Sequence, residues 1–246
     1  MIKEELKAIL LEGVKAADPE LAVVSNVFLD GEALIVCGSI FDLRAYKRII
    51  VVGAVKASER MAAGIEKVLG SRIDKGVVVT KRKTGLTKMI EVMEGSHPLP
   101  DKRSIVATEK IIGLLDGCGC GDLVIVLISG GGSSLLCRPK VSLEAFREVT
   151  EGLMKAGADI RELNTVRKKL SSVKGGRLAA LAGGADVLSL IISDVVGDDL
   201  EFIASGPTVS DSSTKEEARQ ILEKYGIANK EASECLSGKD RAVESS

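Results

Sequence analysis

Short aliphatic runs alternate along the chain with stretches whose apolar residues recur three and four positions apart. The runs consist mainly of Val, Ile and Leu and predict buried strands over residues 48–53, 76–80, 123–128 and 186–192. The periodic stretches predict helices over residues 3–17, 58–69, 101–115 and 214–225, with two or three more before residue 182. This alternation implies an α/β fold, with a mainly parallel sheet covered by helices on both faces. Ligands of such folds sit beyond the carboxyl ends of the strands.

Three segments do not follow this alternation. Residues 24–37 hold two apolar runs around Asp30-Gly31 and predict a β-hairpin. Residues 81–100 are polar and irregular, and they end in the sequence SHPLP. After Gly226 the sequence turns polar, and residues 239–246 offer nothing to pack, so we expect a linker or a cut end there.

Composition limits the class of protein. The chain has 246 residues and is 45% hydrophobic, enough for a sizeable core, which must be aliphatic because aromatics make up only 2%. A net charge of −1 argues against a nucleic-acid or membrane-surface partner, since either needs a cationic surplus. No run approaches the roughly 20 apolar residues of a membrane span. Residues 1–17 lack the regions of a signal peptide, so a cytoplasmic protein is expected. The scarcity of Asn and Gln is typical of thermophilic proteins.

The strand over residues 123–128 runs directly into three glycines flanked by serines. Glycine permits positive φ and lets a ligand approach the main chain closely. Backbone N–H groups in such a turn can converge on an anion, and the start of a following helix favours negative charge. We therefore interpret this loop as a site for a phosphate or a carboxylate, the alternative being a tight turn without a ligand. Its residues are Ser129, Gly130, Gly131, Gly132, Ser133 and Ser134.

Two positively charged segments could complement that loop. Lys56 follows the strand expected over residues 48–53 and lies near the positive end of the next helix, which costs about 0.3–1 kcal/mol unless an anion compensates it. The alternative is a lysine that reaches into water. Residues 164–177 (NTVRKKLSSVKGGR) are strongly basic and place Asn164, Arg167 and Lys168 on one helical face. Such a face suits phosphates, and a solvated cationic face is its ordinary alternative.

One acidic residue stands at the edge where α/β proteins bind ligands. Asp194 follows the strand over residues 186–192, and its carboxylate could hold Mg²⁺ or accept a proton from a hydroxyl. Asp198 and Asp199 in the same loop are weaker candidates, and turn formation is the alternative for all three. His97, the single histidine, precedes Pro98 and is expected to be a turn residue.

Several nucleotide-binding signatures are absent from the sequence. It contains no GxxxxGK[ST] and no HRD or DFG set, which argues against a Walker-type NTPase and a protein kinase. No strand is followed by GxGxxG with an acidic residue about 20 positions further on, so a dinucleotide site is poorly supported.

Five segments, taken in order, resemble the glycerate 2-kinase family, whose members are also named hydroxypyruvate reductases: GAVKAS, SHPLPD, LISGGGSSLL, NTVRKKLSSVKGGRLA and ISDVVGDDLEFIASGPT. The resemblance covers residues 1–225. It implies ATP-dependent phosphorylation of D-glycerate at the 2-hydroxyl with a divalent metal. It also implies a three-layer α/β/α Rossmann-like domain, followed by a smaller C-terminal domain that closes the cleft. We thus expect residues 1–226 to form the Rossmann-like N-terminal domain, and residues 227–246 to be a linker or the truncated start of a missing C-terminal domain.

The same resemblance implies roles for individual residues. Lys56 matches the family's proposed catalytic lysine, and Asp194 matches an aspartate that acts as base or as Mg²⁺ ligand. The loop of Ser129, Gly130, Gly131, Gly132, Ser133 and Ser134 would hold a phosphate or the substrate carboxylate. The basic motif in the cleft corresponds to Asn164, Lys168, Lys174 and Arg177. The implied ligands are ATP, Mg²⁺ and glycerate, and a homodimer is compatible with the sequence. The alternatives are hydroxypyruvate reduction with NAD(P)H and a non-catalytic anion-binding domain.

Overall fold

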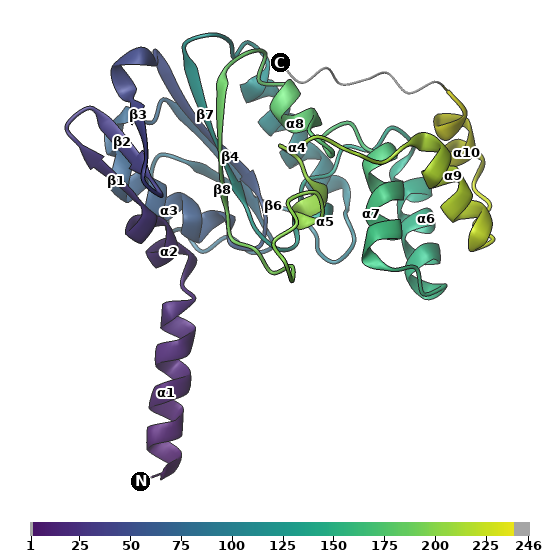
Figure 1. Ribbon diagram of the computed structural model, residues 1–246, viewed down its shortest axis with the longest axis horizontal. Coiled ribbons are helices and arrows are strands. Elements are labelled where there is room, and N and C mark those ends of the chain that lie inside the picture. The colour runs from purple at the N-terminus through teal and green to yellow at the C-terminus, as the bar shows by residue number, and fades with distance from the viewer. Residues whose placement is uncertain (1, 239–246) are drawn as a thin grey trace.

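The computed structural model describes residues 2–238 and is built around a five-stranded sheet (Figure 1). The spatial order is β6-β5-β4-β7-β8, and each neighbouring pair is parallel. The strands are β4 (Arg48–Ala54), β5 (Lys75–Thr80), β6 (Glu91–Glu94), β7 (Asp122–Ile128) and β8 (Asp186–Ile191). The parallel sheet predicted from the aliphatic runs is confirmed. Strand β6 was not predicted, because its sequence EVME lies within the polar stretch and buries only Val92.

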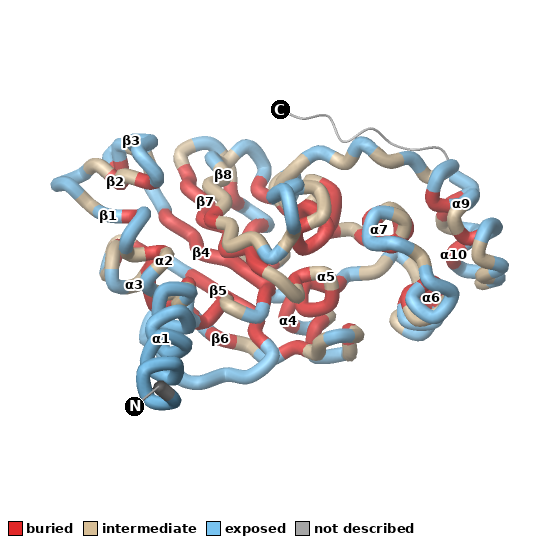
Figure 2. Tube along the Cα trace, turned by 60° about the horizontal axis from the view of Figure 1, so that its bottom comes forward, coloured by how far each residue is buried: buried red, intermediate tan, exposed pale blue. Residues whose placement is uncertain are grey.

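Helices cover both faces of this sheet, as predicted for a three-layer α/β/α domain. Side chains alternate along β4, so that Ile49 and Val51 face one core while Ile50 and Val52 face the other. The first core includes residues of α2 (Pro19–Asn26) and α3 (Ser58–Leu69). The second includes residues of α4 (Lys102–Leu115) and α8 (Arg177–Ala180). Figure 2 shows β4, β5 and β7 as the buried middle of the molecule.

The sheet reverses its direction of winding between β4 and β7. From the central strand β4 the chain adds β5 and β6 on one side, and then β7 and β8 on the other side. Ligands of open α/β sheets bind in the crevice outside the carboxyl ends of the two strands at such a switch point. The switch point therefore lies beyond Ala54 of β4 and Ile128 of β7.

A small antiparallel sheet precedes the main one. It consists of β1 (Val27–Asp30), β2 (Ala33–Val36) and β3 (Ser39–Asp42). The hairpin predicted around Asp30-Gly31 is confirmed, since Asp30 pairs with Ala33 and Gly31 has φ +58°. The third strand and helix α2 were not predicted.

A helical bundle follows β7 and lies beside the sheet (Figure 1). It contains α6 (Leu143–Lys155), α7 (Ile160–Lys169), α9 (Lys215–Lys224) and α10 (Lys230–Ser237), which share one apolar core. Helix α10 lies in the stretch expected to be a linker, yet its Ala232 and Leu236 are buried. The expected boundary at residue 226 thus falls between two helices of one bundle. The polar tail over residues 239–246 lies outside the described residues.

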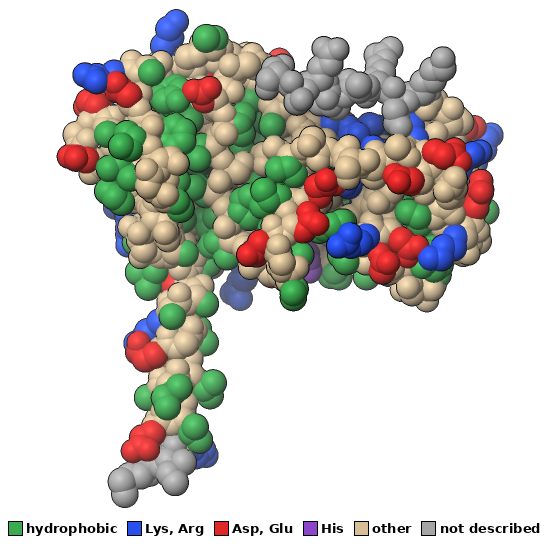
Figure 3. Space-filling view, viewed as in Figure 1, with side chains coloured by type: hydrophobic (Ala, Val, Ile, Leu, Met, Phe, Trp, Pro, Cys, Tyr) green, Lys and Arg blue, Asp and Glu red, His purple; other side chains and the backbone are tan. Residues whose placement is uncertain are grey.

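The first helix, α1 (Ile2–Ala16), stands away from the rest of the molecule (Figures 1 and 3). The helix was predicted, but its apolar stripe is not covered, as Ile9 is 69% and Leu10 is 70% exposed. None of the helices in residues 2–238 is both long and apolar enough to cross a membrane.

Candidate active site

The glycine loop lies at the switch point of the sheet. Strand β7 ends at Ile128, and the chain turns through the loop into the short helix α5 (Gly132–Leu135). The Lys56 backbone N–H donates to the Gly130 carbonyl oxygen at 3.1 Å, so the end of β4 is fastened to the loop. The Ala57 N–H donates to Ser129 Oγ at 3.4 Å. The structure thus brings Lys56 and the glycine loop together.

The glycines are needed because other site residues lie directly against them. A Cβ on Gly130 would lie 2.0 Å from Asp194 Oδ2. Gly131 has φ +86°, and a Cβ there would lie 2.8 Å from Lys56 Cγ. The carboxylate of Asp194 and the aliphatic stem of Lys56 therefore flank the loop at adjacent positions. Three predicted site elements, far apart in sequence, meet here.

Replacing Gly132 by Ala is expected to lower the free energy of unfolding by about 1–3 kcal/mol, because the added methyl overpacks a buried position. A Cβ on Gly132 would lie 2.5 Å from the Ala204 Cβ. Gly113 offers a matched control, since a Cβ there meets nothing within 4 Å. Gly113→Ala, inside α4, is expected to stabilise by about 0.5–1 kcal/mol. Urea unfolding followed by circular dichroism measures both, and equal effects of the same sign would contradict this packing.

His97 also lies at the loop, which sequence reasoning missed. Its Cδ2 would be 3.1 Å from a Cβ on Gly131, and Ser134 Oγ donates to the Pro98 carbonyl next to it. The available signal was topological, because the SHPLP segment follows the carboxyl end of a strand, β6, that was itself not recognised. His97 is thus more than an isolated turn residue.

The surroundings of His97 are electropositive. Partial burial lowers the His97 pKa below its usual value of 6.5, and the charges of Lys56, Lys81 and Arg167 lower it further. Within the part of the chain that the structure describes, no carboxylate forms an ion pair with the Lys56 ammonium. The crevice is therefore suited to an anion.

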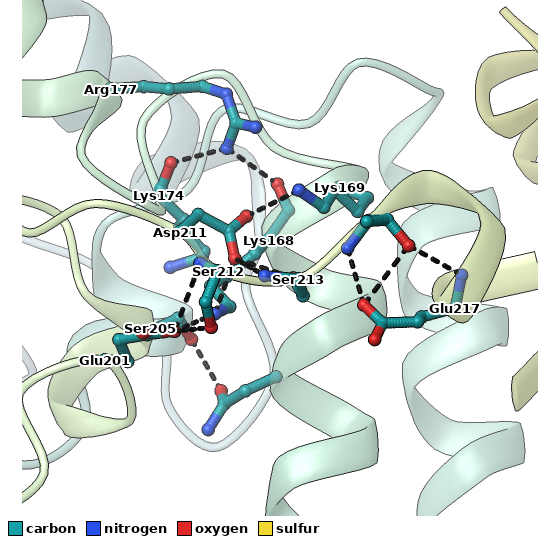
Figure 4. A network of polar contacts seen from close by, with 12 residues as sticks. Lys168, Lys169, Lys174, Arg177, Glu201, Ser205, Asp211, Ser212, Ser213 and Glu217 are labelled. Carbon is teal, nitrogen blue, oxygen red and sulfur yellow. Dashed lines mark hydrogen bonds and ion pairs between the residues drawn. The ribbon is translucent and has the colours of Figure 1, made fainter. Parts of the chain in front are cut away.

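The basic motif on α7 is partly neutralised from within the protein (Figure 4). Lys168 Nζ lies 2.7 Å from Asp211 Oδ1 and 3.0 Å from Glu201 Oε2, and Lys169 Nζ lies 2.9 Å from Asp211 Oδ2. Burial alone would raise the pKa of Asp211, but hydrogen bonds from Lys168, Ser213 and Lys169 lower it to about 2. That Lys168 binds a phosphate stays a prediction, and its two carboxylate partners favour a structural role.

Lys174 and Arg177 support the backbone around the loop. Lys174 is fully buried, and its Nζ donates to the Leu136 carbonyl oxygen at 3.0 Å and to that of Gly132 at 3.5 Å. Burial lowers the Lys174 pKa to about 7. Arg177 donates to the carbonyl oxygens of Lys168 at 3.0 Å and Lys174 at 2.6 Å. Their contacts favour a supporting role, and direct phosphate binding by either residue stays a prediction.

A chain of hydroxyls joins the glycine loop to α7. Ser133 Oγ lies 2.8 Å from Ser205 Oγ, and the Ser205 hydroxyl donates to Asn164 Oδ1 at 2.7 Å. Ser205 has φ +63° and Ala204 has φ +53°, which are strained values for residues other than glycine. Such strain is often found at functional sites. Ser205 was not among the candidate site residues identified from the sequence.

The chain's own side chains fit a magnesium ion only in part. Among residues 2–238, no group of three or more His, Cys, Asp or Glu side chains could hold a metal ion. Magnesium is commonly bound by one or two carboxylates together with substrate phosphates and waters. Asp194, against the glycine loop, fits the role of a single protein ligand to magnesium that arrives with a nucleotide.

The chain is similar over most of its length to proteins that carry a name or have a solved structure. Glycerate 2-kinase of Pyrococcus horikoshii is 46% identical over 222 residues, which make up 89% of this chain and 49% of that protein. D-Glycerate 2-kinase of Thermotoga maritima is 49% identical over 189 residues, 75% of this chain and 45% of that protein. A solved structure of a Pyrococcus horikoshii protein has a TM-score of 0.84 at 42% identity, covering 96% of this chain and 54% of that one.

The chain spans about half the length of the curated relatives it matches. Similar proteins of Agrobacterium vitis carry the provisional name hydroxypyruvate reductase. The resemblance drawn from the five sequence segments is confirmed. The family described as a domain of unknown function, DUF4147, matches residues 5–237, and this chain belongs to that family.

Proposed function

We propose that this protein transfers the γ-phosphoryl group of ATP to the 2-hydroxyl of D-glycerate, giving 2-phosphoglycerate and ADP. The observation that carries the proposal is the meeting of Lys56, the glycine loop and Asp194 at the switch point. The names of the relatives, glycerate 2-kinases of Pyrococcus horikoshii and Thermotoga maritima, supply the substrate.

Phosphoryl transfer depends on positioning and charge neutralisation more than on covalent chemistry by the protein. Lys56 lies against Gly131, so its ammonium can neutralise phosphoryl oxygens held above the loop. The loop contributes backbone N–H groups and, having no side chains at three successive positions, lets the phosphate approach closely. Ser133 lies at the start of α5 and is held in place by Ser205.

Asp194 is the proposed proton acceptor. Its carboxylate lies directly over Gly130, so a 2-hydroxyl held beside the loop would be within its reach. As the hydroxyl oxygen bonds to phosphorus and the bond to ADP breaks, the hydroxyl proton passes to Asp194. Bound magnesium would supply further neutralisation of phosphate charge.

Hydroxypyruvate reduction is the second candidate, favoured only by the provisional names of some relatives. The end of β4 and the turn that follows it read GAVKAS, which lacks the GxGxxG pattern of a dinucleotide-binding turn. A dinucleotide-binding turn would place glycine there to let the pyrophosphate approach the backbone. We therefore prefer phosphoryl transfer.

The direct test is phosphorus NMR of this chain with ATP, Mg²⁺ and D-glycerate. A 2-phosphoglycerate signal supports the proposal. A parallel sample with NADH and hydroxypyruvate tests the reductase by loss of absorbance from NADH. Binding of ATP and D-glycerate without any product would instead favour a non-catalytic anion-binding domain.

Phosphate is expected to raise the His97 pKa. In the free protein the imidazole should titrate below 6.5, because burial and the three nearby cations disfavour its protonated form. An anion on the loop offsets those cations, so inorganic phosphate should move the midpoint upward. His97 is the only histidine, which makes its proton NMR signals unambiguous. Potassium chloride at equal ionic strength is the control, and an identical midpoint in both salts would contradict an anion site at the loop.

Two further expectations belong to this proposal. A homodimer can be checked by light scattering of the purified chain. A cytoplasmic location, which is where ATP and glycerate would be available together, can be checked by fractionation of the source cells.

A further inference from the structure

Helix α7 carries a buried arginine, Arg167, whose Nε has no hydrogen-bond partner among residues 2–238. Arg167 is 8% exposed, and its Nε is buried. The adjacent Lys168 and Lys169, in contrast, both pair with Asp211. A buried charge is costly unless it is paired and hydrogen-bonded. Arg167 is therefore suited to bind a ligand that supplies the missing hydrogen-bond acceptor and negative charge.

Asn164 presents a second unpaired donor on the same face of α7, one turn earlier. It is 1% exposed, and its Nδ2 has no hydrogen-bond partner among residues 2–238. The amide orientation is set by Ser205, whose hydroxyl donates to Asn164 Oδ1 at 2.7 Å. Leaving a buried hydrogen-bond donor unsatisfied costs about 1–3 kcal/mol. One acceptor group bound between Asn164 Nδ2 and Arg167 Nε would remove this cost at both donors.

We propose that Arg167 and Asn164 bind the carboxylate of the substrate, an inference that rests on the proposed function for the identity of that substrate. A carboxylate is an acceptor-only group with two oxygens, which suits one guanidinium and one amide N–H. Lys56 and the glycine loop, which offer a point charge and backbone N–H groups, remain for the phosphate.

The two sites are joined closely enough for one small molecule. Ser133 of the glycine loop reaches Asn164 through a single intervening hydroxyl, that of Ser205. A 2-hydroxy acid carries its reacting hydroxyl on the carbon next to the carboxylate, so the carboxylate must be anchored beside the loop. The charge of Arg167 also acts on His97, which lies against the loop.

Binding of small acids by the 246-residue chain tests this assignment. The probes are D-glycerate, formate, glycerol and inorganic phosphate, with affinities measured by calorimetry. The Nε–H signal of Arg167 in nitrogen-edited NMR reports the site itself. Formate and D-glycerate are expected to shift that signal, while glycerol, which has no carboxylate, should leave it in place.

Asn164→Asp is the sharpest variant, because it keeps an oxygen to accept from Ser205 and replaces the unpaired donor by a negative charge. It should weaken D-glycerate binding by about 10- to 100-fold, the loss of hydrogen bonds to a charged group. Its melting temperature should be unchanged or higher, since the new carboxylate faces Arg167. Arg167→Met should weaken D-glycerate binding at least as much. Arg161→Met, on the same helix but exposed, is the matched control and should bind normally.

The outcomes separate the two proposals. If D-glycerate binds but neither shifts Arg167 Nε–H nor distinguishes the variants from wild type, the carboxylate site is wrong and the proposed function stands. If formate shifts the signal and D-glycerate does not bind, the carboxylate site is supported, but the proposal that glycerate is the substrate is wrong. If neither formate nor D-glycerate binds, both the carboxylate site and the proposed function are wrong. Equal loss of phosphate and D-glycerate affinity in Asn164→Asp would also overturn a separate carboxylate site.

Discussion

Asp211→Ala is expected to lower the free energy of unfolding by about 3–5 kcal/mol, the cost of leaving a buried charge without its partner. Asp211 is the shared partner of Lys168 and Lys169, and the side chains of all three are at most 6% exposed. Removing the carboxylate leaves two buried ammonium groups, and among the described residues only Lys168 keeps a carboxylate partner, Glu201. Denaturant unfolding followed by circular dichroism measures the change.

Asp116→Ala is the control for this variant. Asp116 is exposed at the end of α4, so its replacement should change stability by no more than about 0.5 kcal/mol. The two variants remove the same chemical group, one from the interior and one from the surface. A loss below about 1 kcal/mol for Asp211→Ala would mean that the lysines find other partners or lose their protons.

The same residue also makes the free energy of unfolding depend on pH in the acid range. The Asp211 pKa is lowered from 3.8 to about 2 in the folded state, so the unfolded chain binds the proton more readily. The stability from this ionised carboxylate is present above pH 4 and is lost as the pH falls toward 2. It amounts to about 2 kcal/mol for a difference of this size. Asp211→Ala should remove this part of the acid dependence.

In the proposed phosphoryl transfer, Lys56→Ala is expected to reduce turnover by about 10²–10³-fold, the range seen when one preorganised electrostatic donor is removed from a transition state. Lys56 is exposed and its side chain lies over Gly131, so folding should be affected by no more than about 0.5 kcal/mol. Initial rates of 2-phosphoglycerate formation, with calorimetry of phosphate binding, measure the effect.

Lys75→Ala is the matched control, because Lys75 is also exposed but begins β5 at the opposite edge of the sheet. It should leave turnover and phosphate affinity as they are. Near-normal turnover in Lys56→Ala would remove Lys56 from the mechanism. A loss of stability equal to the loss of activity would point to a structural role instead.

The central strands of the sheet could be predicted because each is marked by the residues of its own short segment. Strands β4 and β7 are almost wholly buried, so they appear in the sequence as continuous aliphatic runs. Parallel strands end at one edge, which is why Lys56, the glycine loop and Asp194 could be expected near one another. Strand β6 and helix α10 escaped notice because each buries very few side chains, Val92 in one and Ala232 and Leu236 in the other.

Partners distant in sequence could not be predicted. The sequence shows that Lys168 and Lys169 are charged, but it does not show that Asp211 lies against them. In the same way, the sequence does not show that Arg167 Nε, unlike the ammonium groups of its two neighbours, is left without a partner among the described residues. The apolar stripe of α1 predicted a helix correctly, yet helical periodicity carries no information about whether a partner covers the stripe.

The bundle of α6, α7, α9 and α10 is assembled from two stretches of chain that frame residues 170–214. Residues 170–214 include strand β8, Asp194 and Ser205. The packing of α7 against α9 therefore holds the two ends of this segment together. Holding the ends of such a long segment together costs conformational entropy, which the apolar contacts of the bundle offset. A ligand bound at the proposed site would hold residues 170–214 in place, so we expect it to slow amide exchange in α9 and α10.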